Sequence, residues 1–235
     1  MKNLDIYFSD ACNSNCQYCI MKDLKHNNDA IRQALEDGTF VTNVRHALRP
    51  ETISIGFWGR EPSINGEYFS NFIFNLLDYS PYIRYIIIPT NGQSETFYKD
   101  FIQPLYCYCN SHHRKIILMI QFSLDGPPEL QDRYRGSGSA DKCINTIKYM
   151  CKMFPFSNKY LRLRISTKTT FTGYEIENVI PHLWYQYMYD LYCFASPYFK
   201  RYEDNKIGIT GITVEVPGNY TVEQGKCLKK WKNFF

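Results

Sequence analysis

The sequence predicts an α/β fold built on a parallel sheet. Three observations support this prediction: short apolar segments recur along the chain, segments with helical spacing separate them, and polar motifs directly follow several of the apolar segments. Strands and helices that alternate in this way form crossover units, which produce a parallel sheet with helices outside it. The expected strands are residues 4–8, 52–58, 83–88, 116–122, 161–167 and 207–216. The expected helices are residues 28–36, 66–79, 95–106, 140–153 and 175–191.

Local signals place the ends of several elements. The first helix is expected to end at Asp37 and Gly38, because glycine readily adopts the left-handed conformation that follows a helix. The second helix is indicated by apolar residues at helical spacing, which are Tyr68, Phe69, Phe72, Ile73, Leu76 and Leu77. Pro104 is expected to bend or end the third helix, because proline has no backbone N–H to donate.

Length and composition limit the classes of protein to consider. A chain of 235 residues suits one α/β domain and buries about 70 to 75% of its unfolded surface, so its nine cysteines are not required as disulfides. The net charge of +4 is spread along the chain, and nucleic-acid binding is therefore not expected. No signal peptide and no membrane-spanning stretch is evident, which favours a reducing cytoplasm as the location.

Polar motifs follow four of the expected strands. They are the cysteine segment 12–19 and residues 59–62, 90–92 and 123–126. In parallel sheets ligands gather at the edge formed by the carboxyl ends of the strands. We therefore expect the four motifs to meet around one pocket.

Three cysteines, Cys12, Cys16 and Cys19, follow the first expected strand at spacings of four and three residues. Three thiolates suit a four-iron four-sulfur (4Fe-4S) cluster with one open iron better than they suit a filled metal cage. One alternative is a structural zinc site completed by His26, although the chain has no second Cys-x-x-Cys pair. The other is a set of unrelated thiols.

The cysteine spacing, its place near the N-terminus and the aromatic Tyr18 before the last cysteine resemble the radical S-adenosylmethionine (SAM) superfamily. The resemblance implies that Cys12, Cys16 and Cys19 hold a 4Fe-4S cluster, that SAM chelates the open iron, and that Tyr18 lies near the adenine. It also implies that reductive cleavage of SAM gives a 5'-deoxyadenosyl radical, which takes hydrogen from a substrate. An electron donor such as flavodoxin or ferredoxin would then be a partner.

Residues 56–62 resemble the glycine-glycine-glutamate-proline motif of the same superfamily. The resemblance implies that Gly59, Arg60, Glu61 and Pro62 form a strand end that approaches the methionyl ammonium group of SAM, where glycine permits close contact with the backbone. Arg60 replaces the second glycine of the motif, and its side chain is expected to block this approach or to shift SAM. A strand-to-helix turn without a ligand is the alternative.

Residues 123–136 resemble the signature of the superfamily branch that carries SPASM or Twitch extensions, which includes sulfatase-maturating and peptide-modifying enzymes. The resemblance implies that Ser123 and Asp125 help to hold the ribose of SAM and the pocket wall. It also implies that Asp132 and Arg135 order the following loop, with Arg135 counted among the residues of the SAM site.

Two further strand ends supply candidates for SAM contact. Asn91, in the turn of residues 90–92, matches the third strand end of the family, where it would line the SAM site. Arg164 and Ser166 lie on the fifth expected strand and could reach SAM. The alternative is the ordinary alternation of polar and apolar residues along a strand.

The resemblance implies a partial (βα)6 barrel over residues 1–217, followed by a short basic tail at residues 218–235. The tail either ends a compact form or begins a missing C-terminal extension with auxiliary clusters. The six remaining cysteines are expected to be structural, and they are Cys107, Cys109, Cys143, Cys151, Cys193 and Cys227.

Three functions remain open at this point. The first is a radical SAM enzyme that modifies a peptide or protein side chain. The second is a glycyl-radical activase or an enzyme of modified-nucleobase synthesis. The third is a non-catalytic barrel that serves as a binding or scaffold module, which Arg60 and Gln131, the latter at a position where histidine is usual, would favour. No catalytic acid or base is identified.

Overall fold

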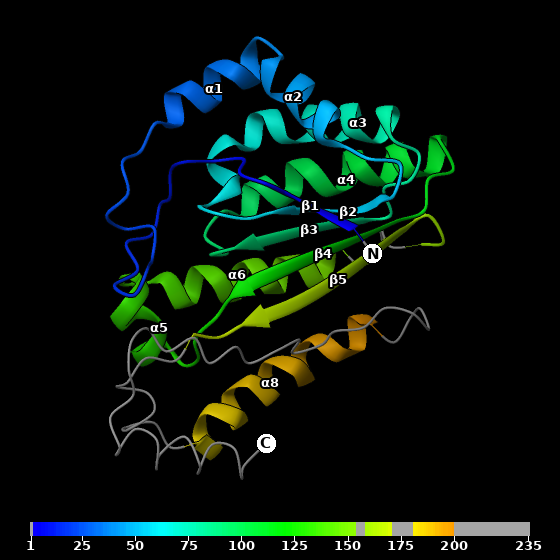
Figure 1. The fold of residues 1–235 in the computed structure, drawn as a ribbon. Coiled ribbons are helices and arrows are strands. Elements are labelled where there is room, and N and C mark those ends of the chain that lie inside the picture. The colour runs from blue at the N-terminus through cyan, green and yellow to red at the C-terminus, as the bar shows by residue number, and fades with distance from the viewer. Residues whose placement is uncertain (1, 154–157, 171–180, 200–235) are drawn as a thin grey trace.

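The computed structural model describes residues 2–153, 158–170 and 181–199. One sheet runs through this part of the chain, and its strands follow one another in sequence order. The strands are β1 (Lys2–Ile6), β2 (Thr52–Phe57), β3 (Tyr85–Thr90), β4 (Ile116–Ser123) and β5 (Leu161–Lys168). Every neighbouring pair is parallel, which confirms the predicted α/β fold with a parallel sheet (Figure 1). The expected sixth strand, residues 207–216, lies outside the described residues.

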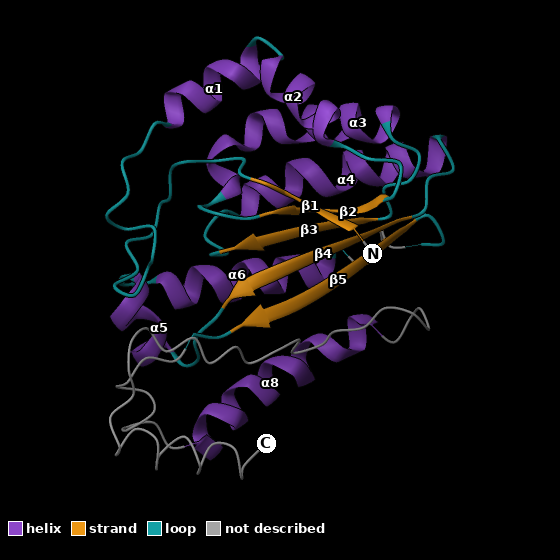
Figure 2. Ribbon diagram, viewed as in Figure 1, coloured by secondary structure: helices purple, strands orange, loops and turns teal. Residues whose placement is uncertain are grey.

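Helices connect the strands. They are α1 (Asn28–Glu36), α2 (Thr39–Ala47), α3 (Gly66–Tyr79), α4 (Glu95–Ser111), α5 (Pro128–Arg135), α6 (Ser139–Lys152) and α8 (Pro181–Phe199), with a 3-10 turn η1 (Pro62–Asn65) before α3. Helix α3 contacts α4, α4 contacts α6, and α6 contacts α8, so the long helices form one continuous layer (Figure 2). None of the described helices is both long and apolar enough to cross a membrane.

The hydrophobic core lies between this helical layer and one face of the sheet. On β4, Leu118, Ile120 and Phe122 are fully buried, whereas the residues between them are only half-buried. Strand β5 alternates in the same way from Leu161 to Ile165, is buried at Ser166 and Thr167, and pairs in register with β4, Met119 opposite Arg164. Because side chains alternate between the two faces of a strand, the half-buried residues lie on the face turned away from the core.

A cluster of aromatic rings fixes the chain directly after β1. Phe8 is 1% exposed, and its ring centroid lies 5.1 to 5.6 Å from those of Phe57, Phe69 and Phe72. Such pairs add about 0.5 to 1.5 kcal/mol each beyond the burial of their area. The loop that carries the cysteines therefore starts from a rigid point.

The structure differs from the sequence-based expectations in several elements. Helix α2 and the short helix α5 were not expected. Helix α4 does not end at Pro104 but continues to Ser111. Helix α8 runs beyond residue 191 to Phe199, and the expected start of this helix at residues 175–180 lies outside the described residues.

Candidate functional site

The loop between β1 and α1 carries the three cysteines and crosses the edge formed by the carboxyl ends of the strands. Near its start, the carbonyl oxygen of Ala11 accepts a hydrogen bond of 3.2 Å from the backbone N–H of Glu61, which follows β2. In Figure 1 this blue loop extends as far as α5. The backbone N–H of Gln17 donates to the carbonyl oxygen of Tyr134 in α5 at 3.0 Å, so the loop is held at both of these places.

Asn91, directly after β3, contacts the first part of the loop. Its Nδ2 donates to Oδ1 of Asn13 at 2.6 Å and lies 3.7 Å from Sγ of Cys12. Its Oδ1 accepts from the backbone N–H of Gln93 at 3.0 Å, and the Gln93 side chain in turn donates to Ser14. The predicted site residue Asn91 is therefore brought next to a predicted cluster ligand.

Glu61 joins the ends of β2 and β3. Its side chain is buried and accepts hydrogen bonds from the backbone N–H of Asn91 at 2.7 Å, the hydroxyl of Thr90 at 3.0 Å and the backbone N–H of Ser63 at 3.2 Å. Burial raises the pKa of the Glu61 carboxyl, and these hydrogen bonds oppose the rise. The carboxylate is thus bonded to backbone and side-chain groups of the protein. Pro62, the next residue, begins the turn η1.

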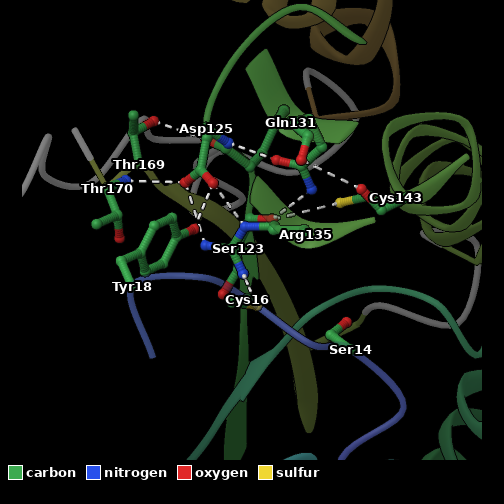
Figure 3. Close-up of polar contacts among 12 residues, drawn as sticks. Ser14, Cys16, Tyr18, Ser123, Asp125, Gln131, Arg135, Cys143, Thr169 and Thr170 are labelled. Carbon is green, nitrogen blue, oxygen red and sulfur yellow. Dashed lines mark hydrogen bonds and ion pairs between the residues drawn. The ribbon is translucent and has the colours of Figure 1, made fainter. Parts of the chain in front are cut away.

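Asp125 is the most heavily bonded polar group at this edge. Its Oδ2 accepts from Nε of Arg135 at 2.6 Å and from the hydroxyl of Tyr18, and its Oδ1 accepts from Nη2 of Arg135 at 3.1 Å and from the backbone N–H of Thr170 at 2.9 Å (Figure 3). The side chain is 1% exposed. Both oxygens accept hydrogen bonds from protein groups, so in this structure Asp125 positions Tyr18 and Arg135. Its expected contact with the ribose of SAM stays a prediction.

Arg135 connects this network to the cysteines. Its guanidinium carbon lies 5.3 Å from the ring centroid of Tyr18, and its Nη1 lies 3.8 Å from Sγ of Cys16 (Figure 3). The carboxylate of Asp125 holds the pKa of Arg135 above its ordinary value despite burial, so the guanidinium is cationic. A fixed positive charge therefore faces the sulfur of Cys16.

The three loop cysteines are free thiols within electrostatic reach of one another. Burial raises the pKa of the half-buried Cys16, Arg135 lowers it, and negative charges on Cys12 and Cys19 would raise it further. Three thiols match an iron–sulfur cluster in the kind of donor, and the carboxylates within electrostatic reach are those of Glu61 for Cys12 and Asp125 for Cys16. In the described residues, however, no three or more His, Cys, Asp or Glu side chains are placed so that together they could hold a metal ion. Ligation by the three cysteines stays a prediction.

Arg60 contacts the cysteine loop at two places. Its Nη2 donates to the carbonyl oxygen of Met21, and its Nε lies 3.4 Å from Oδ1 of Asp10. Gly59 has φ +110°, and a Cβ there would lie 2.2 Å from the ring of Tyr7. The altered motif therefore holds the cysteine loop through its arginine.

Ser123 and Ser166 are the two predicted site residues that lie within strands. They belong to β4 and β5, where Ser166 pairs with Gln121 and Ser123 pairs with Lys168. Among the described residues, no hydrogen bond joins either serine to the cysteine loop. Their predicted contact with SAM is therefore not tested by the contacts of this structure.

Several residues of the network were not predicted as site residues. Gln131 accepts at 2.8 Å from the backbone N–H of Asp125 and donates at 3.2 Å to the carbonyl oxygen of Ser123. Trp184 of α8 donates at 2.9 Å to the carbonyl oxygen of Asp125. Gln131 could have been found from its place inside the signature, whereas nothing in the sequence around Trp184 marks it.

The other cysteines lie outside this network. Cys109, Cys143 and Cys151 are buried, and burial raises the pKa of each thiol to about 12. These neutral thiols pack as small apolar residues of the core. Cys107 and Cys193 are exposed, and Cys227 lies outside the described residues.

Comparison with known proteins shows the fold. No family model matches the sequence, and no curated protein matches it. Among solved structures, the chain resembles the anaerobic sulfatase-maturating enzyme anSMEcpe with bound AdoMet, at 19% identity and a TM-score of 0.55 over 80% of this chain and 48% of that one. A structure of anSMEcpe with bound AdoMet and the Kp18Cys peptide gives the same values.

A hexahistidine-tagged form of anSMEcpe with bound AdoMet gives a TM-score of 0.58 at 18% identity, over 99% of this chain and 59% of that one. The chain thus spans about half to three fifths of the length of these structures. At this identity the likeness establishes a shared fold, which is the partial barrel that the sequence predicted.

Proposed function

We propose that this chain is a radical SAM enzyme that modifies a peptide or protein side chain. One observation carries the proposal: the cysteine loop is held at the carboxyl edge of the sheet by residues of all three other motifs, namely Arg60, Asn91, Asp125 and Arg135. A chain that used its cysteines only as core residues would have no need of this arrangement. The shared fold with AdoMet-bound and peptide-bound anSMEcpe supports the same function.

Cys12, Cys16 and Cys19 would hold a 4Fe-4S cluster, which when bound supplies the electron for reductive cleavage of SAM. Arg135 would donate to the Cys16 sulfur and keep positive charge beside it. Asp125 would hold Arg135 and Tyr18 in place, and Asn91 would fix the loop beside Cys12. A soluble electron donor such as flavodoxin or ferredoxin and a cytoplasmic location belong to the same proposal.

Anaerobic reconstitution with iron and sulfide tests the proposal. The wild-type protein should bind about four irons per chain and should release 5'-deoxyadenosine from SAM on reduction with dithionite. The variant C12A/C16A/C19A should lose both, whereas C107A, at an exposed cysteine outside the loop, should keep both. Unchanged iron content in the triple variant would refute the cluster assignment.

The substrate class needs its own measurement. Candidate peptides incubated with the reconstituted protein, SAM and reductant should show a mass change by mass spectrometry, dependent on all three components. Cluster binding without SAM binding, measured by calorimetry, would instead favour the scaffold module. Release of 5'-deoxyadenosine coupled to a glycyl radical or a nucleobase product would favour the second enzymatic alternative.

A further inference from the structure

Arg164 lies on the sheet face that is turned away from the helical core. Its neighbours on β5, Leu163 and Ile165, are buried in the core, whereas Arg164 is half-buried on the opposite face. Its partner in register is Met119 of β4, which pairs in turn with Ile87 of β3. The arginine thus stands next to apolar residues of β4 and β3, in a row that continues to Gly56 of β2 and ends at Asp5 of β1.

The guanidinium of Arg164 has no counter-charge in the described part of the chain. Its Nε is fully buried and makes no hydrogen bond, and the ion pairs of the described residues do not include it. A buried N–H donor without a partner is costly, and such donors in proteins are usually paired with protein groups, water or a ligand. Arg164 therefore has binding capacity that the fold does not use.

A second polar group beside Arg164 is also unsatisfied. Oε1 of Gln121 is buried without a hydrogen-bond partner. Gln121 pairs with Ser166, two residues along β5 from Arg164, and therefore lies diagonally across from the arginine on the same face. A ligand that suits this place carries an anionic group for the guanidinium of Arg164 and a hydrogen-bond donor for Oε1 of Gln121.

Depth along the strands separates this place from the cysteine loop. Arg164 is four residues, about 13 Å of strand, before Lys168 at the carboxyl end of β5. The loop, in contrast, is held by Asn91 and Asp125, which follow the last residues of β3 and β4. A ligand group that reaches Arg164 lies below the strand ends where the cofactors would sit.

We propose that Arg164, with Gln121 beside it, binds a carboxylate of the substrate. This inference rests on the proposed function and names its substrate class. The substrate would be a peptide whose acidic side chain or terminal carboxylate lies against this face of the sheet, farther from the carboxyl ends of the strands than the cofactors. The planar guanidinium pairs with a carboxylate through two parallel hydrogen bonds, which fixes its orientation as well as its position. The amide N–H next to that carboxylate would meet the free oxygen of Gln121.

Two small probes of equal shape and different charge test the proposal, namely the C-terminal amides of N-acetyl-L-glutamate and N-acetyl-L-glutamine, of which only the first carries a carboxylate. Titrations followed by NMR on the full chain should show binding of the glutamate and at least tenfold weaker binding of the glutamine. The variant R164Q should lose about 10- to 100-fold in affinity for the glutamate, as expected for a hydrogen-bonded charge. R164K should lie between the two, because lysine keeps the charge but not the planar pair.

Arg162 offers a matched control, because it precedes Arg164 by two residues on the same strand face and pairs with Ile117. R162Q should keep the affinity within about twofold. An equal loss in R162Q would show that binding follows the total charge of β5 and would overturn the proposal. If R164Q does not fold, as judged by circular dichroism, the two probes on the wild-type protein and R164K still decide, and no preference for the glutamate would refute the site.

Two further measurements identify the source of the anion. SAM affinity of the reconstituted protein should be the same in R164Q, and a loss equal to that of the glutamate probe would assign Arg164 to the carboxylate of SAM. Orthophosphate that binds more tightly than the glutamate would assign a phosphate ligand and overturn the carboxylate. The probe titrations also work on iron-free protein, so preserved discrimination without cluster formation would refute the proposed function alone.

Discussion

Asp125 and Arg135 form a buried ion pair with two hydrogen bonds, of 2.6 Å between Oδ2 and Nε and 3.1 Å between Oδ1 and Nη2. The two side chains are 1% and 8% exposed. The pair joins the end of β4 to the end of α5, and through Tyr18 it also reaches the cysteine loop.

Removing one partner of this pair should be strongly destabilising. D125N leaves the Arg135 guanidinium buried without its counter-charge, so we expect a loss of about 3 to 5 kcal/mol in the free energy of unfolding. Guanidinium chloride denaturation measures it. E67Q, which breaks the exposed pair of Arg32 and Glu67, is the control and should have little effect. A loss for D125N no larger than that of E67Q would contradict the structural role of the pair.

Replacing Arg60 with glycine should loosen the cysteine loop. R60G restores the glycine of the related motif but removes the contacts with Met21 and Asp10, at an expected cost of about 1.5 to 3 kcal/mol. Hydrogen exchange should become faster at the amides of Cys19 and Lys22, which are bonded within the loop. Slower exchange there, together with tighter SAM binding, would show that Arg60 obstructs the site and does not support it.

Alanine at Gly59 should be destabilising for two reasons that can be separated. The positive φ costs about 1 to 3 kcal/mol for a residue with a side chain, and the Cβ would also collide with Tyr7. Gly136 has a similar φ of +104° but open space around it, so G136A should show the strain alone. We expect thermal denaturation to give the larger loss for G59A, with part of it recovered in the double variant Y7A/G59A. Equal losses for G59A and G136A would exclude the collision.

Asp132 should stabilise the protein in a pH-dependent manner. It accepts hydrogen bonds from the backbone N–H groups of Gly138 and Ala140 and from the Ser139 hydroxyl, and so acts as a cap for α6. Burial raises the pKa of Asp132, but these hydrogen bonds lower it more, and the net pKa lies below its ordinary value.

A carboxyl whose pKa falls on folding contributes stability above its unfolded pKa of about 3.9, and the contribution disappears as the pH falls through the folded pKa. D132A should therefore cost about 0.5 to 2 kcal/mol at pH 7, the range for replacing a helix cap by alanine, and progressively less below about pH 4. Unfolding measured from pH 7 to pH 3 tests this. D141N, which changes an exposed carboxylate in the first turn of the same helix, should show a smaller effect; an equal one would contradict the cap.

Local signals predicted much of the fold. Helices α1 and α3 begin and end at the expected residues, and Gly38 has the expected left-handed conformation, because their periodicity and end signals agree. Helix α2 was missed since it buries no residue fully and carries several β-branched residues, which disfavour a helix locally. Tertiary packing forms it: Phe40, Val41 and Val44 pack against the core.

Pro104 is a second place where tertiary packing outweighs a local sequence signal, here a signal against a helix. Proline disfavours a helix interior, yet Phe101, Leu105 and Cys109 around it are buried on one face of α4. That burial outweighs the local cost. The sequence signal for the longer helix is the spacing of these three residues at i, i+4 and i+8, which the interpretation of Pro104 as an end signal overrode.

In the site, sequence spacing identified which motifs would meet, but it did not reveal the directions of the side chains. Arg60 turns to Met21, and Asp125 turns to Arg135 and Tyr18, because these partners become available only in the folded sheet. The direction of a polar side chain at a strand end depends on residues far away in the sequence, and neither propensity nor periodicity contains that information.

The contact between Tyr18 and Asp125 spans 107 positions of the chain. During synthesis, the ribosome must release the fourth strand and α5 before the N-terminal loop has anything to dock against. If the cysteines hold the proposed cluster, its insertion is expected late in biogenesis, after more than half of the polypeptide has left the exit tunnel. A nascent chain stalled before residue 125 should leave Cys16 and Cys19 open to alkylation, and one stalled well beyond residue 135 should partly shield these two half-buried cysteines.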